Sequence, residues 1–262
     1  MTFLFASHLS AYSSKCQDSL VVRASLDSAI NRSISYFKNH EDMDISTMFN
    51  YHFLARKFDI PDLFPTNLIY EKLNSGGNMM IYDNALLYRL IDKSFTVSKE
   101  ELEKQLTSTT REVQLRSVYC DLYPIDKKKM IKDLYAEADK GDYALTHALL
   151  SLQWMKENNC FKPDEVVQLE EYIVGKQVEL LNDHQEMNDL TIEAIAFLLY
   201  CNHHNLLKAN WLDKIILLQQ EDGGWKWNSS ELNTATHPSI LALWALLEWR
   251  EPGMNIPWIE KQ

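Results

Sequence analysis

The sequence contains few helix-breaking residues, because only 7 of its 262 residues are glycine and only 7 are proline. This composition is low in turn residues for an all-β protein and is typical of a mostly helical one. Basic residues are in the minority, and the formal net charge is −11. A charge of this sign argues against a protein that binds nucleic-acid phosphates and against docking on an anionic membrane surface. No apolar run reaches the length of a membrane-spanning helix.

Several well-known site motifs are also missing. The chain has no glycine-rich phosphate loop and no Gly-x-Ser-x-Gly nucleophile motif. Its cysteines form no Cys-x-x-Cys pair and match no zinc motif, so we expect buried free thiols. These cysteines are Cys16, Cys120, Cys160 and Cys201.

The N-terminal residues resemble the end of a secretory signal. Residues 1–14 have a weak apolar centre followed by small residues, although a basic region is missing. We expect residues 1–17 to be a residual signal or a disordered segment, and residues 18–262 to form one domain. An exported protein is favoured over a cytoplasmic one on this pattern.

The rest of the chain alternates amphipathic helices with more apolar ones. Apolar residues recur at helical spacing from residue 20 to residue 37, and Ser98 with Glu101 forms a capping-box pattern. The other predicted helices cover 45–58, 66–73, 79–91, 110–122, 126–138, 143–156, 163–181, 190–203, 211–220 and a last one ending at 249. Amphipathic helices bury one face, whereas helices that are apolar all round need neighbours on every side.

A repeat supports this alternation. Thr146, Thr191 and Thr236 begin similar apolar segments, each 45 residues after the last. Equal spacing of a like element indicates a repeat architecture. We therefore predict an all-α fold, an (α/α)6-type toroid of about six helical hairpins, with apolar helices inside and amphipathic helices outside.

The C-terminal part carries a resemblance to a known family. Gln219-Gln220-Glu221-Asp222-Gly223-Gly224-Trp225 resembles the Gln-Trp repeat motif of squalene cyclases and related terpenoid cyclases. The segment from Thr236 to Leu247 resembles an inner helix of that family and of protein prenyltransferase β-subunits. The resemblance implies a toroid with a central cavity that binds an apolar or isoprenoid-like small molecule.

In such a toroid the inner helices begin at one mouth of the cavity, where free N–H groups and the helix dipoles meet. We expect polar side chains there from Asp44, Asp83, Arg111, Asp142, His147, Asp189, Glu193 and His237. Tyr51, Tyr82, Tyr143 and Trp225 are candidate aromatic lining. We predict ligand binding by Asp44, Asp83, Asp142, Tyr143, His147 and Trp225.

The sharpest hypothesis is a catalytic cluster of Asp189, Glu193 and His237, with zinc as a candidate cofactor. Two imidazoles and a carboxylate, from His147, Glu193 and His237, suit zinc with an open position. By the resemblance, His237 stands where prenyltransferase β-subunits carry a zinc-ligating histidine, but Thr191 replaces the cysteine of their Asp-x-Cys pair. The competing interpretation is that these residues only cap inner helices.

Other functions stay open. Terpenoid cyclases use an Asp-x-Asp-Asp motif as the general acid. This chain lacks that motif, and its nearest acidic run is Glu41 to Asp44. An acidic, aromatic cavity also suits a carbohydrate-active or carbohydrate-binding barrel, with Asp44, Asp83, Asp142 and Asp189 as candidate carboxylates. A third alternative is a non-catalytic toroid that binds a protein partner through its acidic rim. Whether the chain is an enzyme, and its oligomeric state, do not follow from the sequence.

Overall fold

All regular structure in the described part of the chain is helical. The structure is a computed structural model that describes residues 23–40, 43–75, 86–184, 186–254 and 256–259. Within these ranges the one β feature is an isolated antiparallel bridge between Trp225 and Ala235. The predicted all-α class is therefore confirmed.

The helices begin and end close to the predicted positions. A helix over residues 23–39 comes first. It is followed by α2 (Ile45–Phe58), α3 (Thr66–Ser75), the 3-10 turn η1 (Leu86–Leu90), α5 (Lys99–Lys104), α6 (Thr109–Tyr119), α7 (Lys127–Lys140), α8 (Asp142–Glu157), η2 (Pro163–Glu165), α9 (Val167–Asp183), α10 (Asp189–Tyr200), η3 (His204–Leu206), α11 (Ala209–Leu217) and α12 (Thr236–Arg250).

Several predicted boundaries differ from the structure by three or four residues, in α6, α9, α10 and α11, and one predicted helix differs in type. The described part of the predicted helix 79–91 is the 3-10 turn η1, and α10 ends at Tyr200 rather than at residue 203. Asn202 has a φ of 65°, in the left-handed region. A residue in that conformation cannot continue a right-handed helix. The helix therefore ends before the predicted position at residue 203.

Local capping explains where several helices begin. The capping box of α5 is complete, with Glu101 N–H donating to Ser98 Oγ and Ser98 N–H donating to the Glu101 carboxylate. Asp126 caps α7 by accepting from two backbone N–H groups. Such caps satisfy donors that the first turn leaves unpaired.

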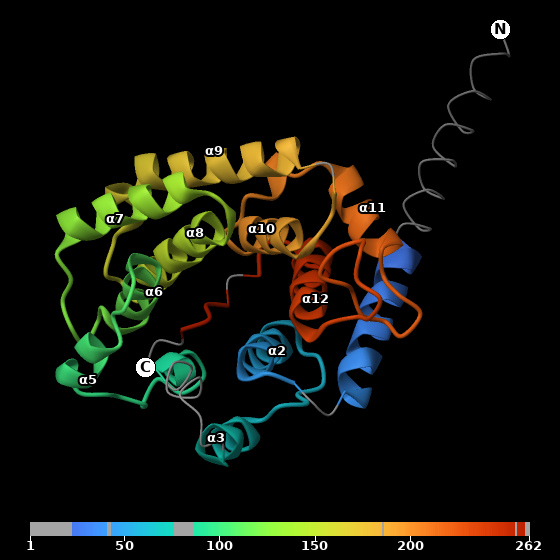
Figure 1. The fold of residues 1–262 in the computed structure, drawn as a ribbon, viewed down its shortest axis with the longest axis horizontal. Coiled ribbons are helices and arrows are strands. Elements are labelled where there is room, and N and C mark those ends of the chain that lie inside the picture. Colours follow the sequence, from blue (N-terminus) through green and yellow to red (C-terminus); the bar gives the residue numbers. More distant parts are fainter. Residues whose placement is uncertain (1–22, 41–42, 76–85, 185, 255, 260–262) are drawn as a thin grey trace, which may run out of the picture.

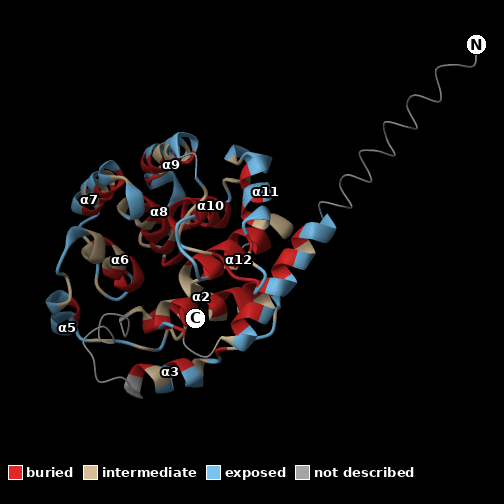
Figure 2. Ribbon diagram, turned by 45° about the vertical axis from the view of Figure 1, so that its right-hand side comes forward, coloured by how far each residue is buried: buried red, intermediate tan, exposed pale blue. Residues whose placement is uncertain are grey.

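The helices form an inner and an outer set, which Figure 1 shows as two curved rows. Inner helices α6, α8, α10, α12 and α2 each pack on the next, while α7 and α9 pack outside α8, and α11 packs on α12. Figure 2 shows that the inner helices are largely buried and that α7, α9 and α11 expose their outer faces. Closure of six hairpins into a complete toroid stays a prediction, because residues 76–85 lie outside the described part.

One hydrophobic core cluster runs from Leu26 to Ile259. Every residue of α10 is buried, and so is α12 from Pro238 to Glu248. These helices have neighbours on all sides, as their apolar sequences require. The core spans most of the predicted domain of residues 18–262.

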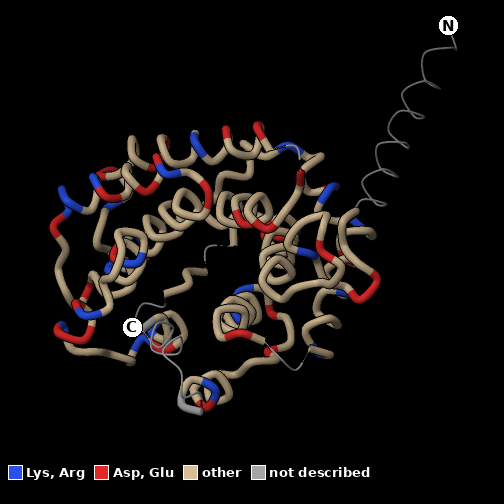
Figure 3. The backbone as a smooth tube through the Cα atoms, viewed as in Figure 1, with Lys and Arg blue, Asp and Glu red and all other residues tan. Residues whose placement is uncertain are grey.

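Charged residues are most frequent on the outer helices and loops, whereas α8, α10 and α12 carry few (Figure 3). In the described part of the chain, no helix combines the length and apolar character needed to cross a bilayer. Figure 3 places the acidic residues mainly on the outer helices, on the loops and near the ends of the inner helices.

The Gly-Gly-Trp turn joins the C-terminal hairpin to the first helix. Gly223 has a φ of 93°, and a Cβ there would collide with the Arg32 carbonyl. Gln219 Nε2 donates to the Ala29 carbonyl at 2.9 Å. The indole N–H of Trp225 donates to a carbonyl of α11 at 2.7 Å, and the ring is 1% exposed. The motif that carries the resemblance is thus a docking element of the fold.

The C-terminal segment lies inside the bundle. The Trp258 ring stacks on Phe53 with ring centroids 4.7 Å apart and makes edge contacts with Trp154 and Trp244. Its backbone N–H donates to the buried carboxylate of Glu157 at 3.1 Å. This end of the inner helices is therefore packed by the chain's own aromatic residues.

The expectation of free thiols is wrong for two of the four cysteines. Cys120, just after α6, and Cys160, in the turn after α8, form a disulfide. Their helices pack together, which brings positions 40 residues apart to a Cα–Cα distance of 6.0 Å. Cys201 is a buried free thiol, as predicted, and Cys16 lies outside the described residues. Disulfides are typical of oxidising compartments, and export stays a prediction.

Candidate functional site

A polar cluster forms where the N-terminal halves of α8, α10 and α12 meet. Asp189 and Glu193 come from α10, His147 from α8 and His237 from α12. Because α10 packs against both other helices, residues far apart in the sequence become neighbours. The predicted catalytic and metal residues therefore lie in one place.

His237 lies between two buried carboxylates. Its Nδ1 is 2.8 Å from Asp189 Oδ1, and its Nε2 is 3.9 Å from Glu193 Oε2. Burial alone would lower the pKa of His237, but the hydrogen bond to Asp189 and the charges of Asp189 and Glu193 outweigh it and raise that pKa. With Asp189 accepting the Nδ1 proton, Nε2 is the nitrogen that is free to exchange a proton.

Glu193 is an interior acid. Its side chain is 2% exposed, and it accepts a hydrogen bond from the Thr146 hydroxyl of α8. Burial penalises the charged form and raises the pKa of Glu193 to about 7, although the bond from Thr146 and the charge of His237 oppose the rise. Near neutral pH this carboxyl exists in both protonation states.

His147 completes the cluster on the α8 side. Its Nε2 is 3.7 Å from Glu193 Oε1, beyond hydrogen-bond length. Withdrawal from water lowers the pKa of His147, and the positive charge of His237 lowers it further. At neutral pH His147 is therefore an uncharged imidazole beside a protonatable carboxyl.

Tyr143 ties the first turn of α8 to α10. Its hydroxyl donates to Asp189 Oδ2 at 2.7 Å, so both oxygens of that carboxylate are engaged. The pKa of Tyr143 is raised, first by burial and then by the charge it donates to. The phenol therefore stays protonated and remains a donor.

The capping interpretation holds for some of these residues and not for others. Asp44 caps α2, since its Oδ1 accepts from Thr47 N–H at 2.9 Å. Asn188 caps α10 in a capping box whose third residue is Thr191. Asp189 and Glu193 have no capping bond and contact side chains of other helices instead. Simple capping therefore does not account for the two carboxylates beside His237.

The remaining predicted residues are scattered. Asp44 reaches the rim through a 3.2 Å hydrogen bond from the Thr236 hydroxyl. Asp142 is exposed, with a φ of 47° at the first position of α8. Arg111 belongs to the first turn of α6. Asp83 and Tyr82 lie outside the described residues.

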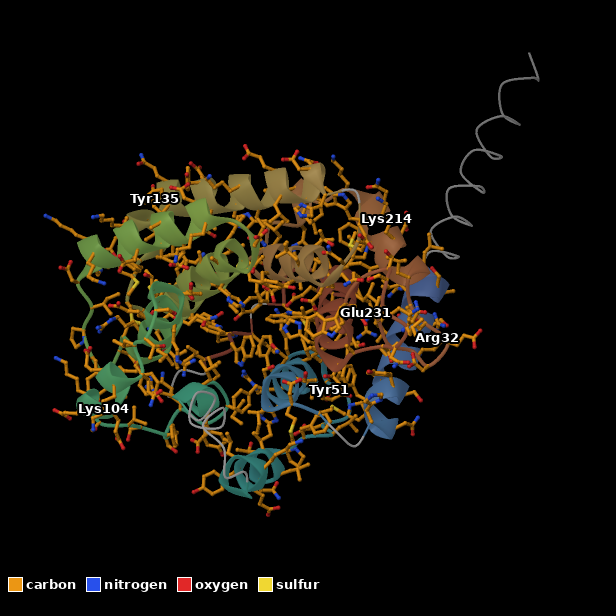
Figure 4. The ribbon with its side chains drawn as sticks, viewed as in Figure 1. Arg32, Tyr51, Lys104, Tyr135, Lys214 and Glu231 are labelled. Atoms are coloured by element: carbon orange, nitrogen blue, oxygen red, sulfur yellow. A yellow bond between two sulfur atoms is a disulfide. The ribbon has the colours of Figure 1, made fainter. Side chains whose placement is uncertain are left out.

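Two predicted aromatics do not belong to this cluster. Trp225 is buried in the turn that docks α11, and it lines a separate pocket. Tyr51 of α2, labelled in Figure 4, is fully buried and packs edge-on against Phe37 and Phe64. Burial in the core accounts for both rings.

Trp227 belongs to this cluster, although it was not among the predicted site residues. Its ring stacks on the His237 ring with centroids 5.2 Å apart and planes 13° apart, and the residue is 42% exposed. Its carbonyl accepts from Asp189 N–H at 3.0 Å, which anchors the loop to α10. Its one sequence signal is a position two residues after Trp225, and that position does not predict a contact with His237.

The 45-residue spacing locates the helices but not their register. Thr146 is the fifth residue of α8, Thr191 the third of α10 and Thr236 the first of α12. Matching positions in the sequence therefore lie at different distances from the N-terminal ends of their helices. This shift lets Thr146 reach Glu193 while Thr191 serves in a cap.

The cluster as placed does not fit a zinc ion. Among the described residues, no three His, Cys, Asp or Glu side chains are positioned to hold one metal. The Nδ1 of His237 is engaged by Asp189, and Thr191, at the position of the family's cysteine, is a capping residue. Zinc binding by His147, Glu193 and His237 is an expectation from the sequence, and the placement of these side chains gives it no support.

Comparison with known proteins finds no relative, since the chain matches no protein-family model, no curated protein and no solved structure. The resemblance to terpenoid cyclases and prenyltransferases therefore rests on the sequence motifs alone.

The arrangement itself has a clear chemical capacity: a histidine held by one carboxylate faces a second carboxyl that exchanges protons near neutral pH.

Proposed function

We propose that this protein binds a small molecule at the mouth formed by the first turns of α8, α10 and α12, and that it moves a proton to or from that molecule. The observation that carries the proposal is the position of His237 between Asp189 and Glu193, both buried. Helix capping alone gives no reason to bury two carboxylates beside one imidazole, since burial of charge is costly.

The proton roles follow from the contacts. Asp189 fixes the Nδ1 proton of His237 and stabilises the charged ring, while Nε2 points towards Glu193. General acid–base catalysis is most efficient when the pKa lies near the working pH, and the pKa of Glu193 is about 7. The His237 side chain is 27% exposed, so a ligand group can approach the imidazole while the Glu193 carboxyl lies 3.9 Å behind its Nε2.

The ligand class that we propose is apolar or isoprenoid-like. The resemblance of the C-terminal hairpin to terpenoid cyclases supports this class, and so do the half-exposed rings of Tyr143 and Trp227 beside the acid–base pair. Glycoside hydrolysis is less well supported, because its two carboxylates must face each other across the sugar. Here the His237 ring occupies the space between Asp189 and Glu193.

The test is histidine-ring NMR of the full chain, titrated with farnesol as the isoprenoid probe and maltohexaose as the carbohydrate probe. We expect farnesol to shift the His237 and His147 ring signals and to change the titration of His237. His237→Asn should abolish farnesol binding measured by calorimetry, whereas His184→Asn, an exposed site at the end of α9, should not. Binding of maltohexaose instead would support the carbohydrate alternative, and no response to either probe would remove the proposal.

A further inference from the structure

A pocket lies on the outer side of the bundle, apart from the acid–base cluster. It is formed by α11, the start of α10 and the loop around the Gly-Gly-Trp turn, and its volume is about 500 Å³. Small-molecule sites in proteins typically span roughly 300–1,000 Å³ and are mostly apolar with a few polar groups. The pocket therefore has the size of a ligand site.

The wall of this pocket is apolar. Ile192 and Trp225 form buried parts of it, and Leu217 and Leu218 stand at its opening. Leu217 is 80% exposed and Leu218 is 42% exposed. Large aliphatic side chains gain free energy when their surface leaves water, so a hydrocarbon chain placed here would be held by the leucines and the indole.

Two lysines give the pocket its polarity. Lys214 of α11, labelled in Figure 4, and Lys226 of the loop both line it. Neither ammonium has a hydrogen-bond acceptor or a carboxylate partner among the residues that the structure describes. The lining carboxylate, Glu186, accepts from Ser229 N–H at 3.0 Å, and that bond and a Ser229 side-chain bond keep its pKa low. In a chain of net charge −11, two unpaired lysines beside an apolar wall select for a negatively charged head group.

We propose that this pocket binds a single-chain amphiphilic carboxylate, that is, a fatty acid of medium length. The hydrocarbon chain lies against Ile192, Leu217 and Trp225, and the carboxylate reaches Lys214 and Lys226. The pairing satisfies both unpaired ammonium groups and covers the exposed leucine. None of the acid–base residues lines this pocket, so the fatty-acid proposal does not depend on the acid–base proposal.

The experiment is calorimetry with decanoate below its critical micelle concentration, with decyltrimethylammonium as the chain-matched cation. We expect decanoate to bind and the cation to bind much more weakly. The double variant Lys214→Gln, Lys226→Gln should weaken decanoate binding about tenfold, since exposed charge-assisted contacts contribute modestly. The double variant Lys128→Gln, Lys132→Gln, at two exposed lysines of α7, makes the same change of charge elsewhere and should leave the affinity unchanged.

A third variant tests the apolar wall. Leu217→Asp should abolish decanoate binding, and its side chain is too exposed for the change to prevent folding, which thermal unfolding would verify. His237→Asn should leave decanoate binding unaltered, which separates this site from the mouth. Equal binding of the anion and the cation, unchanged affinity in the double lysine variant, or no binding of decanoate would each overturn the proposal.

Discussion

Replacing Glu193 with glutamine should stabilise the protein at neutral and alkaline pH. In the folded chain the pKa of Glu193 is raised by burial from its ordinary 4.5 to about 7. The folded state therefore binds more protons than the unfolded state between these values, and stability falls as the pH rises through that window. Above pH 7 the accumulated cost of the buried charge is about 3 kcal/mol.

Glu193→Gln removes this cost and leaves an acceptor for the Thr146 hydroxyl, because the amide oxygen can accept a hydrogen bond. We expect the variant to be more stable than the native chain by up to about 3 kcal/mol at pH 8, with the difference vanishing near pH 4. Urea unfolding at intervals from pH 4 to pH 9 measures the difference.

The matched control has the opposite sign. Burial would raise the pKa of Glu112, but bonds from Lys129 and Arg116 outweigh it and lower that pKa. Glu112→Gln should therefore destabilise the protein near neutral pH, with the loss fading as the pH falls through the acid range. If the Glu193→Gln difference were the same at pH 5 and pH 8, or if it favoured the native chain at pH 8, the account of Glu193 as a buried, proton-exchanging acid would be refuted.

Three further predictions follow from the packing. Reducing the disulfide between Cys120 and Cys160 should lower the free energy of unfolding by about 4 kcal/mol in the loop-entropy model, as measured by urea unfolding with and without reductant. Trp225→Ala should cost about 3–5 kcal/mol, as for other buried large-to-small changes, and an unchanged unfolding midpoint would contradict its role in docking α11. Plasma mass spectrometry should find less than one zinc per purified chain, and stoichiometric zinc lost in His237→Ala would show that the cluster rearranges around a metal.

The residues of the candidate site were predictable because the inner helices all begin at one end of the bundle. Once α8, α10 and α12 were recognised as like elements, the polar residues in their first turns had to lie near one another. This reasoning placed His147, Glu193 and His237 together. The hydrogen bond between His237 and Asp189 could not be predicted, because it depends on how far α10 and α12 are shifted along each other.

Other features needed the packed structure. Trp227 belongs to the site because its loop folds back over α12 and stacks its ring on His237. The disulfide joins cysteines whose spacing matches no motif, and it exists because α6 and α8 are neighbours. Neither contact leaves a periodic pattern in the sequence, so neither could be predicted from it.

The helical class, most helix ends and the division into apolar and amphipathic helices follow from the order of the amino acids alone. These properties depend on local capping and on hydrophobic spacing within one turn, which the chain order encodes directly. The packing of the helices sets which carboxyls are buried away from solvent and which imidazole lies between them. It also places Trp258 at the opposite end of the bundle. Burial and the register between helices are set by contacts across the whole chain, and they give Glu193 a pKa of about 7 where its sequence neighbours alone would leave an ordinary acid.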